Sequence, residues 1–388
     1  MQTITTTEAL ATYCEAARAH PFITVDTEFL RERTYYAKLC LVQLAMPGTG
    51  DENAVLVDPI EGGDALSLAP LYDLFRDPGV VKVFHAARQD LEIFAVAEGV
   101  IPAPLFDTQV AAMVCGFGDQ AGYETLVKKI ARASVDKSSR FTDWSRRPLS
   151  DAQKSYAIAD VTHLRQIYEH LAAKLQETGR SAWVDEELKT LANPDTYRTD
   201  PAEAWRRLKT RNTAPRFLGI LRELARFRET YAQSRDVPRS RVYKDDALLE
   251  LAATKPQSMQ ELGRARLLLR EARKGEIAEG IIAAVRAGID CPADDLPRVA
   301  EDSLGKAQAN PAIADMLRVL LKARSDQSGV AGRLIASAAD LDHLAAGGRD
   351  VPALAGWRRE VFGEDALRLC QGEIGLVVRG DAVTAVPL

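Results

Sequence analysis

The sequence predicts an α/β domain with a mixed sheet, followed by two all-helical bundles. In the first half, short apolar runs that are typical of buried strands alternate with helical patterns. From the proline-containing linker at 193–201 onward, apolar residues recur almost wholly at helical spacing. The length of 388 residues allows two or three domains, each with a sizeable core.

The elements of the first half follow an opening helix in the order β-β-β-α-β-α. That helix is predicted over 8–19, with Thr6 or Thr7 as its cap. Buried strands are predicted over 22–25, 39–45, 54–58 and 80–85, and helices over 66–75 and 89–98. A mixed sheet covered by helices accommodates this order. Further helices are predicted after Asp107 as N-cap, over 122–131, and after Ser150, where S-x-x-Q matches a capping box.

Two carboxylates stand two residues apart at the end of the first apolar strand, in FITVDTEF (22–29). Residues i and i+2 of a strand point to the same face, so Asp26 and Glu28 would project side by side. Adjacent carboxylates repel each other and lose solvation, and a divalent cation with oxygen ligands offsets both costs. A lone D-x-E pair is more often a turn that begins at Asp26 and is capped by Glu28, so the case for a metal site depends on carboxylates further along the chain.

Two further acids follow at positions that suit a site. Asp90 begins a helix after the strand at 80–85, near the carboxyl edge of the sheet, where open α/β sheets place their sites. A first-turn acid there also suits the helix dipole. Asp160 lies among apolar residues of a helix, where an acid costs free energy unless it is paired or bound to a metal. Tyr156 is spaced i, i+4 from Asp160 and therefore shares its helical face.

The four acids tolerate being clustered only around positive charge. Two divalent cations about 3.5–4 Å apart would satisfy them and form a phosphodiester-cleaving site. One cation is expected between Asp26, Glu28 and Asp160, and the other on Asp26 with help from Asp90 through water. The Tyr156 hydroxyl would orient the attacking water or help to accept its proton. The all-oxygen ligand set favours Mg²⁺ or Mn²⁺ over zinc.

The polar segment KSSRFTDWSRRPLS (137–150) is predicted to be a loop that combines an aromatic residue with bases. An exposed Trp144 among these bases would suit contact with a nucleic-acid strand, through stacking and phosphate contacts. The alternative is that Trp144 anchors the loop onto the domain. The bases of the loop are Lys137, Arg140, Arg146 and Arg147.

Three ordered motifs make this half similar to the ribonuclease D family, in the DEDDy branch of the DEDD superfamily of 3′–5′ exonucleases. The motifs are V-D-T-E-F (Val25–Phe29), H-A-A-R-Q-D-L (His85–Leu91) and Y-A-I-A-D (Tyr156–Asp160). The segments Thr34–Leu44, Phe106–Gln109 and Asp143–Leu149 also resemble that family. The resemblance implies a ribonuclease H-like exonuclease domain over 1–192. It also implies that the catalytic residues are Asp26, Glu28, Asp90, Tyr156 and Asp160, and that the four acids among them are the metal ligands.

The second half resembles, over 225–262, the helicase-and-RNase-D C-terminal (HRDC) module, a small helical nucleic-acid-binding bundle. This resemblance implies a first HRDC domain over 205–290 and a second, degenerate HRDC-like domain over 291–388. Bases in or beside the segment DVPRSRVYKDD (236–246) are the expected RNA contacts: Arg226, Arg228, Arg235, Arg239, Arg241 and Lys244. The end of the chain, 372–388, departs from the pattern and is expected as a β-hairpin or as a tail docked in a groove.

The net charge of −5 is unevenly distributed along the chain. Residues 1–195 carry 19 Lys and Arg against 28 Asp and Glu, a net of −9. Residues 196–290 carry 20 against 13, a net of +7, and residues 291–388 carry 11 against 14, a net of −3. The basic middle segment is either a set of solvated helical faces or the footprint of a polyanion.

The composition excludes several classes of protein. Five scattered cysteines without a C-x-x-C pair argue against a disulfide framework and a zinc knuckle, and favour a reducing cytoplasm. The N-terminal residues lack the pattern of a secretory signal, and no run reaches 18 apolar residues, so no membrane contact is expected. Nothing in the sequence indicates an obligate protein partner.

Taken with the resemblance, these features predict a metal-dependent 3′–5′ exoribonuclease that releases 5′-monophosphates. The resemblance implies RNA with a single-stranded 3′ end as partner, in particular a tRNA precursor held by the HRDC modules beside the active site. One alternative is an exonuclease that acts on DNA, because none of the five residues indicates recognition of a ribose 2′-OH. The other is a catalytically silent RNA-binding protein, although all four acids are present.

Overall fold

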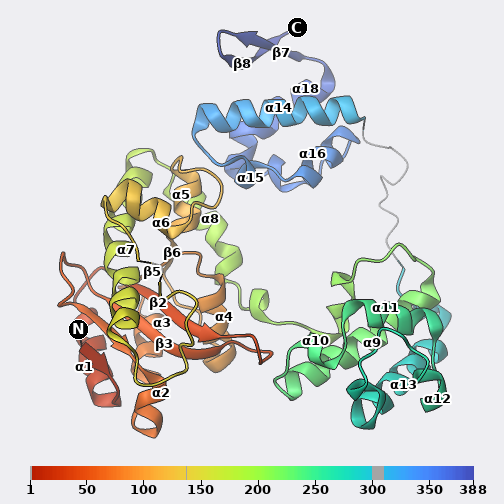
Figure 1. The fold of residues 1–388 in the computed structure, drawn as a ribbon. Helices are drawn as coiled ribbons and strands as arrows, with labels where there is room; N and C mark the ends of the chain where they lie inside the picture. The colour runs from red at the N-terminus through yellow and green to blue at the C-terminus, as the bar shows by residue number, and fades with distance from the viewer. Residues whose placement is uncertain (1, 137, 299–309) are drawn as a thin grey trace.

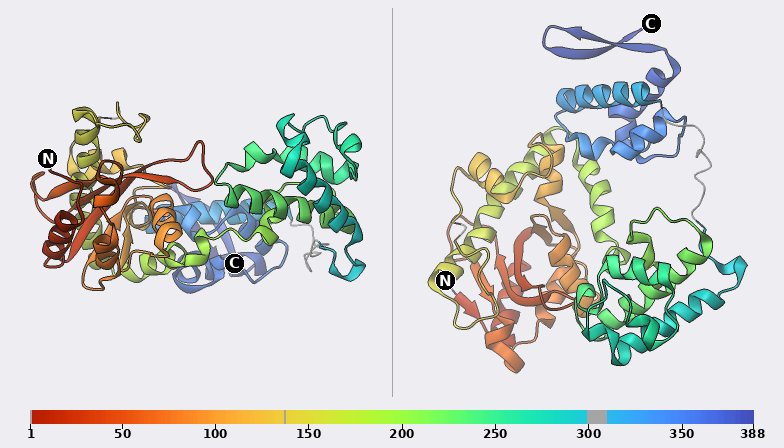
Figure 2. Two further views of the ribbon diagram at one scale, coloured as in Figure 1. Left: turned by 90° about the horizontal axis from the view of Figure 1, so that it is seen from below. Right: turned by 45° about the vertical axis from the view of Figure 1, so that its right-hand side comes forward.

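The computed structural model describes residues 2–136, 138–298 and 310–388 (Figure 1). These residues form an α/β unit, a helical unit and a C-terminal unit, which lie at the corners of a triangle in Figure 1 and in the right-hand view of Figure 2. Each unit is built around apolar cores of its own, with buried residues from Ile4 to Tyr197, from Ala204 to Val285 and from Leu317 to Ile374.

A six-stranded mixed sheet forms the centre of the α/β unit, as predicted. Its strand order is β1 (Gln2–Ile4), β4 (Ala54–Val57), β3 (Lys38–Ala45), β2 (Phe22–Leu30), β5 (Val81–Phe84) and β6 (Leu105–Asp107). β3 runs antiparallel to β2 and β4, whereas the pairs β1–β4, β2–β5 and β5–β6 are parallel. The edge strands β1 and β6 were not predicted, because three residues are too few to show a periodicity.

Helices cover the sheet and begin largely where the capping residues predict. They are α1 (Thr7–Ala17), α2 (Pro59–Gly62), α3 (Ala69–Arg76), α4 (Arg88–Glu98), α5 (Thr108–Val114), α6 (Tyr123–Leu126), α7 (Asp151–Glu177) and α8 (Ser181–Ala192). Thr6 caps α1, Asp107 caps α5, and Ser150 forms the predicted capping box with Gln153 at the start of α7. A π-helical turn over Val127–Ala131 continues α6.

Helix α7 is the element that joins the third sequence motif to the sheet. It packs against β2, β3 and β4. The Thr24 hydroxyl on β2 donates a hydrogen bond of 2.8 Å to the Val161 carbonyl of α7. Arg165 is only 1% exposed, and its guanidinium donates to the carbonyls of Met46 (3.0 Å) and Gly50 (2.7 Å). These contacts fix the register of α7 against the strand that carries Asp26.

A linker with 3-10 turns over Pro194–Tyr197 and Pro201–Arg207 leads to the helical unit. That unit contains α9 (Pro215–Ser234), α10 (Arg239–Val242), α11 (Asp245–Thr254), α12 (Met259–Leu262) and α13 (Gly275–Asp290). α9 and α13 approach closely at Gly288, where a Cβ would lie 2.5 Å from the Ile220 Cα. A larger residue at this position would therefore force the two helices apart.

The C-terminal unit contains α14 (Pro311–Ser328), α15 (Gly332–Ile335), α16 (Ala338–Ala345), α17 (Gly356–Arg358) and α18 (Glu364–Gln371). The chain ends in a hairpin of β7 (Ile374–Arg379) and β8 (Ala382–Pro387), the first of the two expected forms of the tail. The expectation of an all-helical unit is therefore wrong at its end, where alternating apolar residues form strands. Over the described ranges, no helix is both long and apolar enough to cross a membrane.

The C-terminal unit is anchored to helix α8 of the α/β unit. Trp357 stacks on Trp183 with ring centroids 4.7 Å apart and an angle of 10° between the planes. Arg358 pairs with Glu186 at 2.9 Å and with Glu187. An aromatic stack combined with paired charges fixes both the distance and the orientation of the two units.

Candidate active site

Strand β2 carries two of the predicted acids at the centre of the sheet. Asp26 and Glu28 lie opposite Gln43 and Leu41 of β3, and a register shift follows directly after Glu28. Oxygen atoms of Asp26, Glu28 and Asp160 all lie within 4.8 Å of one another. The structure thus places three of the four predicted acids close enough to share one metal ion.

Helix α7 supplies Tyr156 and Asp160 one turn apart, and both line the same cavity as Asp26 and Glu28. The hydroxyl of Tyr123 donates to the carbonyls of Ala159 (3.0 Å) and Asp160 (2.6 Å). Tyr123 therefore holds this turn of α7 against the start of α6. Sequence reasoning missed Tyr123, because no local pattern links α6 to a carbonyl group on α7.

Asp90 lies on the same cavity but outside the group of three acids. It is 7% exposed in the first turn of α4, and its carboxylate accepts a hydrogen bond from the Thr27 hydroxyl. Thr27 lies between Asp26 and Glu28 on β2 and also lines this cavity. Thr27 was not singled out from the sequence, although its place between the two acids was visible there.

The loop that delivers Asp90 is held by Asp107, which does more than cap α5. Its carboxylate accepts hydrogen bonds from the backbone N–H groups of Ala86 (3.0 Å) and Ala87 (2.9 Å), besides that of Gln109 (2.8 Å). Ala86 has a φ of +57°, a left-handed conformation that residues with a Cβ seldom adopt. These hydrogen bonds stabilise the turn from β5 into α4.

Burial raises the pKa values of all four acids, and charges of neighbouring acids raise those of Asp26, Glu28 and Asp90 further. Burial, followed by the charge of Asp160, raises the pKa of Asp26 well above its usual range. Burial raises the pKa of Glu28 to about 10, with Asp26 as the next cause. Burial also raises the pKa of Asp160 to about 7, and that of Asp90 well above its usual range. Carboxylates in this state favour an added positive charge, because it would stabilise their ionised forms.

A cavity of about 650 Å³ contains these groups, and it fits a hard divalent cation. Its acidic donors are carboxylate oxygens, the ligand type that Mg²⁺ and Mn²⁺ prefer. Arg140 also lines the cavity, and its charge acts to lower the pKa values of Glu28 and Asp160. Glu32 and Glu124 line the cavity besides the four predicted acids, so among the described residues one arginine stands against six acids, and the cavity is short of positive charge.

The expected exposure of Trp144 is wrong, and the alternative of an anchoring residue describes it better. Trp144 is 2% exposed, packs among apolar residues of β3, β4 and α7, and lies with its ring centroid 6.0 Å from that of Tyr156. The aromatic residue that this loop exposes is Phe141, which is 91% exposed and lines the cavity. Lys137, also predicted to contact RNA, lies outside the described residues.

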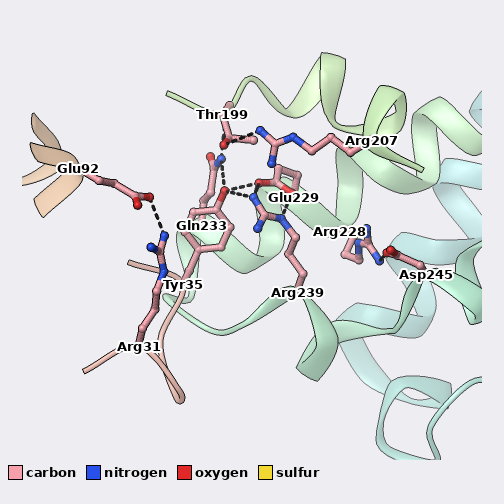
Figure 3. A network of polar contacts seen from close by, with 10 residues as sticks. All are labelled: Arg31, Tyr35, Glu92, Thr199, Arg207, Arg228, Glu229, Gln233, Arg239 and Asp245. Carbon is pink, nitrogen blue, oxygen red and sulfur yellow. Dashed lines mark hydrogen bonds and ion pairs between the residues drawn. The ribbon is translucent and has the colours of Figure 1, made fainter. Parts of the chain in front are cut away.

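Several of the bases expected to contact RNA in the helical unit have partners within the protein. Arg239 pairs with the buried Glu229 at 2.6 Å, and its guanidinium lies over the ring of Tyr35 (Figure 3). Arg228 is buried against Asp245, and Arg226 pairs with Glu223. Arg235 forms a surface pair with Glu276, and Arg241 and Lys244 are exposed. Spacing in the sequence does not show which bases are already paired.

The comparisons with known proteins agree with this architecture. Residues 1–176 match the family model for 3′-5′ exonucleases, and residues 217–285 match the model for the HRDC domain. Ribonuclease D from Jannaschia sp. (strain CCS1) is 62% identical over 384 residues, which cover 99% of each chain. Ribonuclease D from Granulibacter bethesdensis is 49% identical over 384 residues, which cover 99% of this chain and 96% of that one.

Solved structures give the same result. The crystal structure of Escherichia coli RNase D, described as an exoribonuclease involved in structured RNA processing, matches with a TM-score of 0.81 at 31% identity. The match covers 96% of this chain and 98% of that one. The catalytic core of RRP6 from Trypanosoma brucei matches with a TM-score of 0.56 at 22% identity over 74% of this chain and 79% of that one, which shows a shared fold.

The mixed sheet and the exonuclease match over 1–176 define the chain as a 3′–5′ exonuclease. More particularly, the full-length matches show that it belongs to the ribonuclease D family, and it is an exoribonuclease. The resemblance drawn from the three motifs is thereby confirmed. Exonucleases of this type use divalent metal ions, and the acidic cluster around Asp26 suits them.

Proposed function

We propose that the chain trims the 3′ ends of structured RNA, tRNA precursors in particular, by hydrolysis at a site with two divalent cations. The observation that supports this most directly is the meeting of Asp26, Glu28 and Asp160 within 4.8 Å beside the buried Asp90. The match to Escherichia coli RNase D supports structured RNA as the substrate class, because that protein is described as acting in structured RNA processing.

In this proposal, Asp26, Glu28 and Asp160 hold one Mg²⁺ or Mn²⁺ ion, and Asp26 with Asp90 holds the other. Bound cations would stabilise the charge of the reacting phosphate and lower the pKa of the attacking water. Burial, followed by the charge of Asp160, raises the pKa of the Tyr156 phenol above its usual value. Its hydroxyl therefore stays protonated and orients the water through a hydrogen bond.

We also propose the division into domains that the sequence suggests, with an exonuclease domain over 1–192, an HRDC domain over 205–290 and a degenerate HRDC-like domain over 291–388. Support for the last comes from helices α14 to α18 around a separate core, with a capping box between Ser337 and Asp340. Five free cysteines favour a cytoplasmic location for the enzyme.

The proposal is tested by timed digestion of a tRNA that carries a short 3′ extension and a 5′ label, with Mg²⁺, Mn²⁺ or EDTA. We expect a metal-dependent ladder that shortens from the 3′ end and pauses at the mature terminus. A parallel digestion of single-stranded DNA of the same sequence tests the choice of RNA. Trimming that runs through the mature end without a pause would refute tRNA maturation, and equal rates on DNA would refute the preference for RNA.

Replacing Tyr156 by phenylalanine is expected to lower kcat about 100-fold, because the group that orients the attacking water is lost. Affinity for metal ions should change little, since the phenol is not among the proposed ligands. Single-turnover cleavage and titration with Mn²⁺ measure the two quantities. Tyr168→Phe on the same helix is the control, because its ring packs against Phe22 and its hydroxyl makes no hydrogen bond within the described residues. Equal rates for the two variants would exclude the proposed role of Tyr156.

Stabilisation by Mg²⁺ is expected to be larger at about pH 8 than at about pH 5. The pKa of Asp160 is about 7 without metal, above the value of about 4 in an unfolded chain. The folded, metal-free protein therefore binds more protons between these pH values, and its stability falls as pH rises through that window. Mg²⁺ binds the ionised carboxylates and offsets this loss at high pH. Thermal unfolding in MgCl₂ and in EDTA at both pH values measures the effect, and an equal gain in Tm at both would contradict it.

A further inference from the structure

A second cavity lies between the α/β unit and the helical unit, beside the acidic site. It measures about 1190 Å³ and is formed by α4, the loop after β2, the linker over 194–200, and residues of α9 and α10. We call it the basic cleft. Gln89, in the first turn of α4, lines both this cleft and the cavity that contains the acids. The two spaces are therefore neighbours, separated by the residue that precedes Asp90.

The basic cleft differs in charge from the domain that forms most of it. Its lining contains five arginines against two acids, a net of +3, whereas residues 1–195 carry a net of −9. Arg88 and Arg198 are exposed and form no ion pair with any described residue. Arg207 is exposed too, and its one hydrogen bond to a described residue goes to the Thr199 hydroxyl, at 3.0 Å. Unpaired arginines on a concave surface attract an anion and present donors that match phosphate oxygens.

A polar network holds the two walls of the cleft together (Figure 3). The Tyr35 hydroxyl is hydrogen-bonded to Glu229 of α9, and the Asp236 carboxylate accepts the backbone N–H groups of Tyr35 and Tyr36, both at 3.0 Å. Gln233 donates to the Tyr35 hydroxyl (3.1 Å) and to the Thr199 carbonyl (2.9 Å) of the linker. Three segments that are distant in the sequence are thus joined at one place. These hydrogen bonds fix the positions of the two walls, and therefore the shape of the cleft.

We propose that the basic cleft binds the phosphodiester backbone of the RNA segment that lies 5′ to the cleaved nucleotide. This inference rests on the proposed function and extends it, since it says where the rest of the strand runs. With the 3′ nucleotide among the acids, the strand must leave that cavity, and Gln89 marks a shared boundary with a larger, positively charged space. The volume exceeds the range of about 300–1,000 Å³ typical of small-molecule sites, which favours a chain of nucleotides over a free anion.

The test compares the double variant Arg88→Ala/Arg198→Ala with Arg206→Ala/Arg211→Ala in the full chain. Both remove two positive charges, but Arg206 and Arg211 are exposed residues that do not line the cleft. Binding of a fluorescent single-stranded RNA of about 12 nucleotides is measured in EDTA at several salt concentrations. We expect the cleft variant to lose about tenfold in affinity, as two exposed ionic contacts allow. The slope of log K against log salt should fall by about 0.7 for each phosphate contact removed, while the control pair stays at wild-type values.

Cleavage separates this inference from the proposed function. In Mg²⁺ the defect of the cleft variant is expected in KM rather than in kcat, and it should shrink as the RNA is shortened toward a dinucleotide. The single variant Arg198→Ala, at a residue remote in sequence from the acids, should show a smaller increase in KM with the same dependence on RNA length. If the double variant Arg88→Ala/Arg198→Ala cleaves RNA and keeps the wild-type affinity and salt slope, the basic cleft does not bind the RNA backbone. If the unmodified enzyme cleaves no RNA, the proposed function fails instead.

Discussion

Replacing Asp26 by asparagine is expected to lower the rate of RNA cleavage by at least about 1000-fold, while RNA binding is largely retained. The substitution keeps the size of the side chain and removes one charge from the centre of the acidic cluster. Asp26 is the one acid assigned to both proposed cations, and loss of their stabilisation of the reacting phosphate costs several kcal/mol. Single-turnover digestion of a 5′-labelled RNA measures the rate, and a gel shift measures binding.

The matched control is Asp185→Asn, the same change at an exposed acid on α8 that lies outside the cavity. It should cleave at the wild-type rate. Unfolding in EDTA shows that the Asp26 variant is folded, and its Tm should rise, because the substitution removes repulsion that raises the pKa values of Glu28 and Asp90. Cleavage that survives in the Asp26 variant would show that the site has been assigned wrongly.

The acids of the site were predictable because the sequence places each of them on a periodic element. A strand period of two brings Asp26 and Glu28 to one face, and a helical turn brings Tyr156 to Asp160. The pair on β2 and the pair on α7 are then brought together by the order of the strands and by the packing of α7 on β2. Local sequence patterns say little about either of these. Capping residues such as Asp107 and Ser150 were predictable for the same local reason.

The supporting contacts were not predictable, because they join residues that are distant in the sequence. Thr27 to Asp90 spans 63 positions, and Tyr35 to Glu229 spans 194. Whether an aromatic residue in a polar loop is exposed depends on what lies beneath the loop. Trp144 is covered by the apolar residues of β3, β4 and α7, whereas Phe141, three positions earlier, is left exposed at the cavity. Composition therefore identifies the loop, but only the fold decides which aromatic residue is exposed at the cavity.

The same loop contains a buried ion pair whose loss should strongly destabilise the protein. Arg147 bonds through Nε and Nη2 to the two carboxylate oxygens of Asp58, both at 2.6 Å, and Asp58 is fully buried. The guanidinium also donates to the carbonyls of Cys40 and Trp144, both at 2.8 Å. Arg147 thus connects the loop that contains Trp144 to strand β3, through Cys40, and to the start of helix α2, through Asp58. Its removal would leave the Asp58 carboxylate buried without its charge partner.

We expect Arg147→Ala to lower the free energy of unfolding by about 3–5 kcal/mol, the usual cost of an uncompensated buried charge. For a domain of this size that corresponds to a fall in Tm of roughly 10 °C. Cleavage should fall as well, because the loop contributes Arg140, Phe141 and Trp144 to the wall of the acidic cavity. Calorimetry of the full chain and single-turnover cleavage measure the two effects.

Arg146→Ala provides the adjacent control. The Arg146 side chain is 83% exposed and pairs with Asp143 at 3.3 Å, so its loss should change stability by no more than about 1 kcal/mol. Pairing Arg147→Met with Asp58→Asn should recover part of the lost stability, because no charge is then left buried without a partner. If Arg146→Ala and Arg147→Ala unfold at the same temperature, the buried pair does not secure the loop. The position of Phe141 and Trp144 would then depend on apolar packing alone.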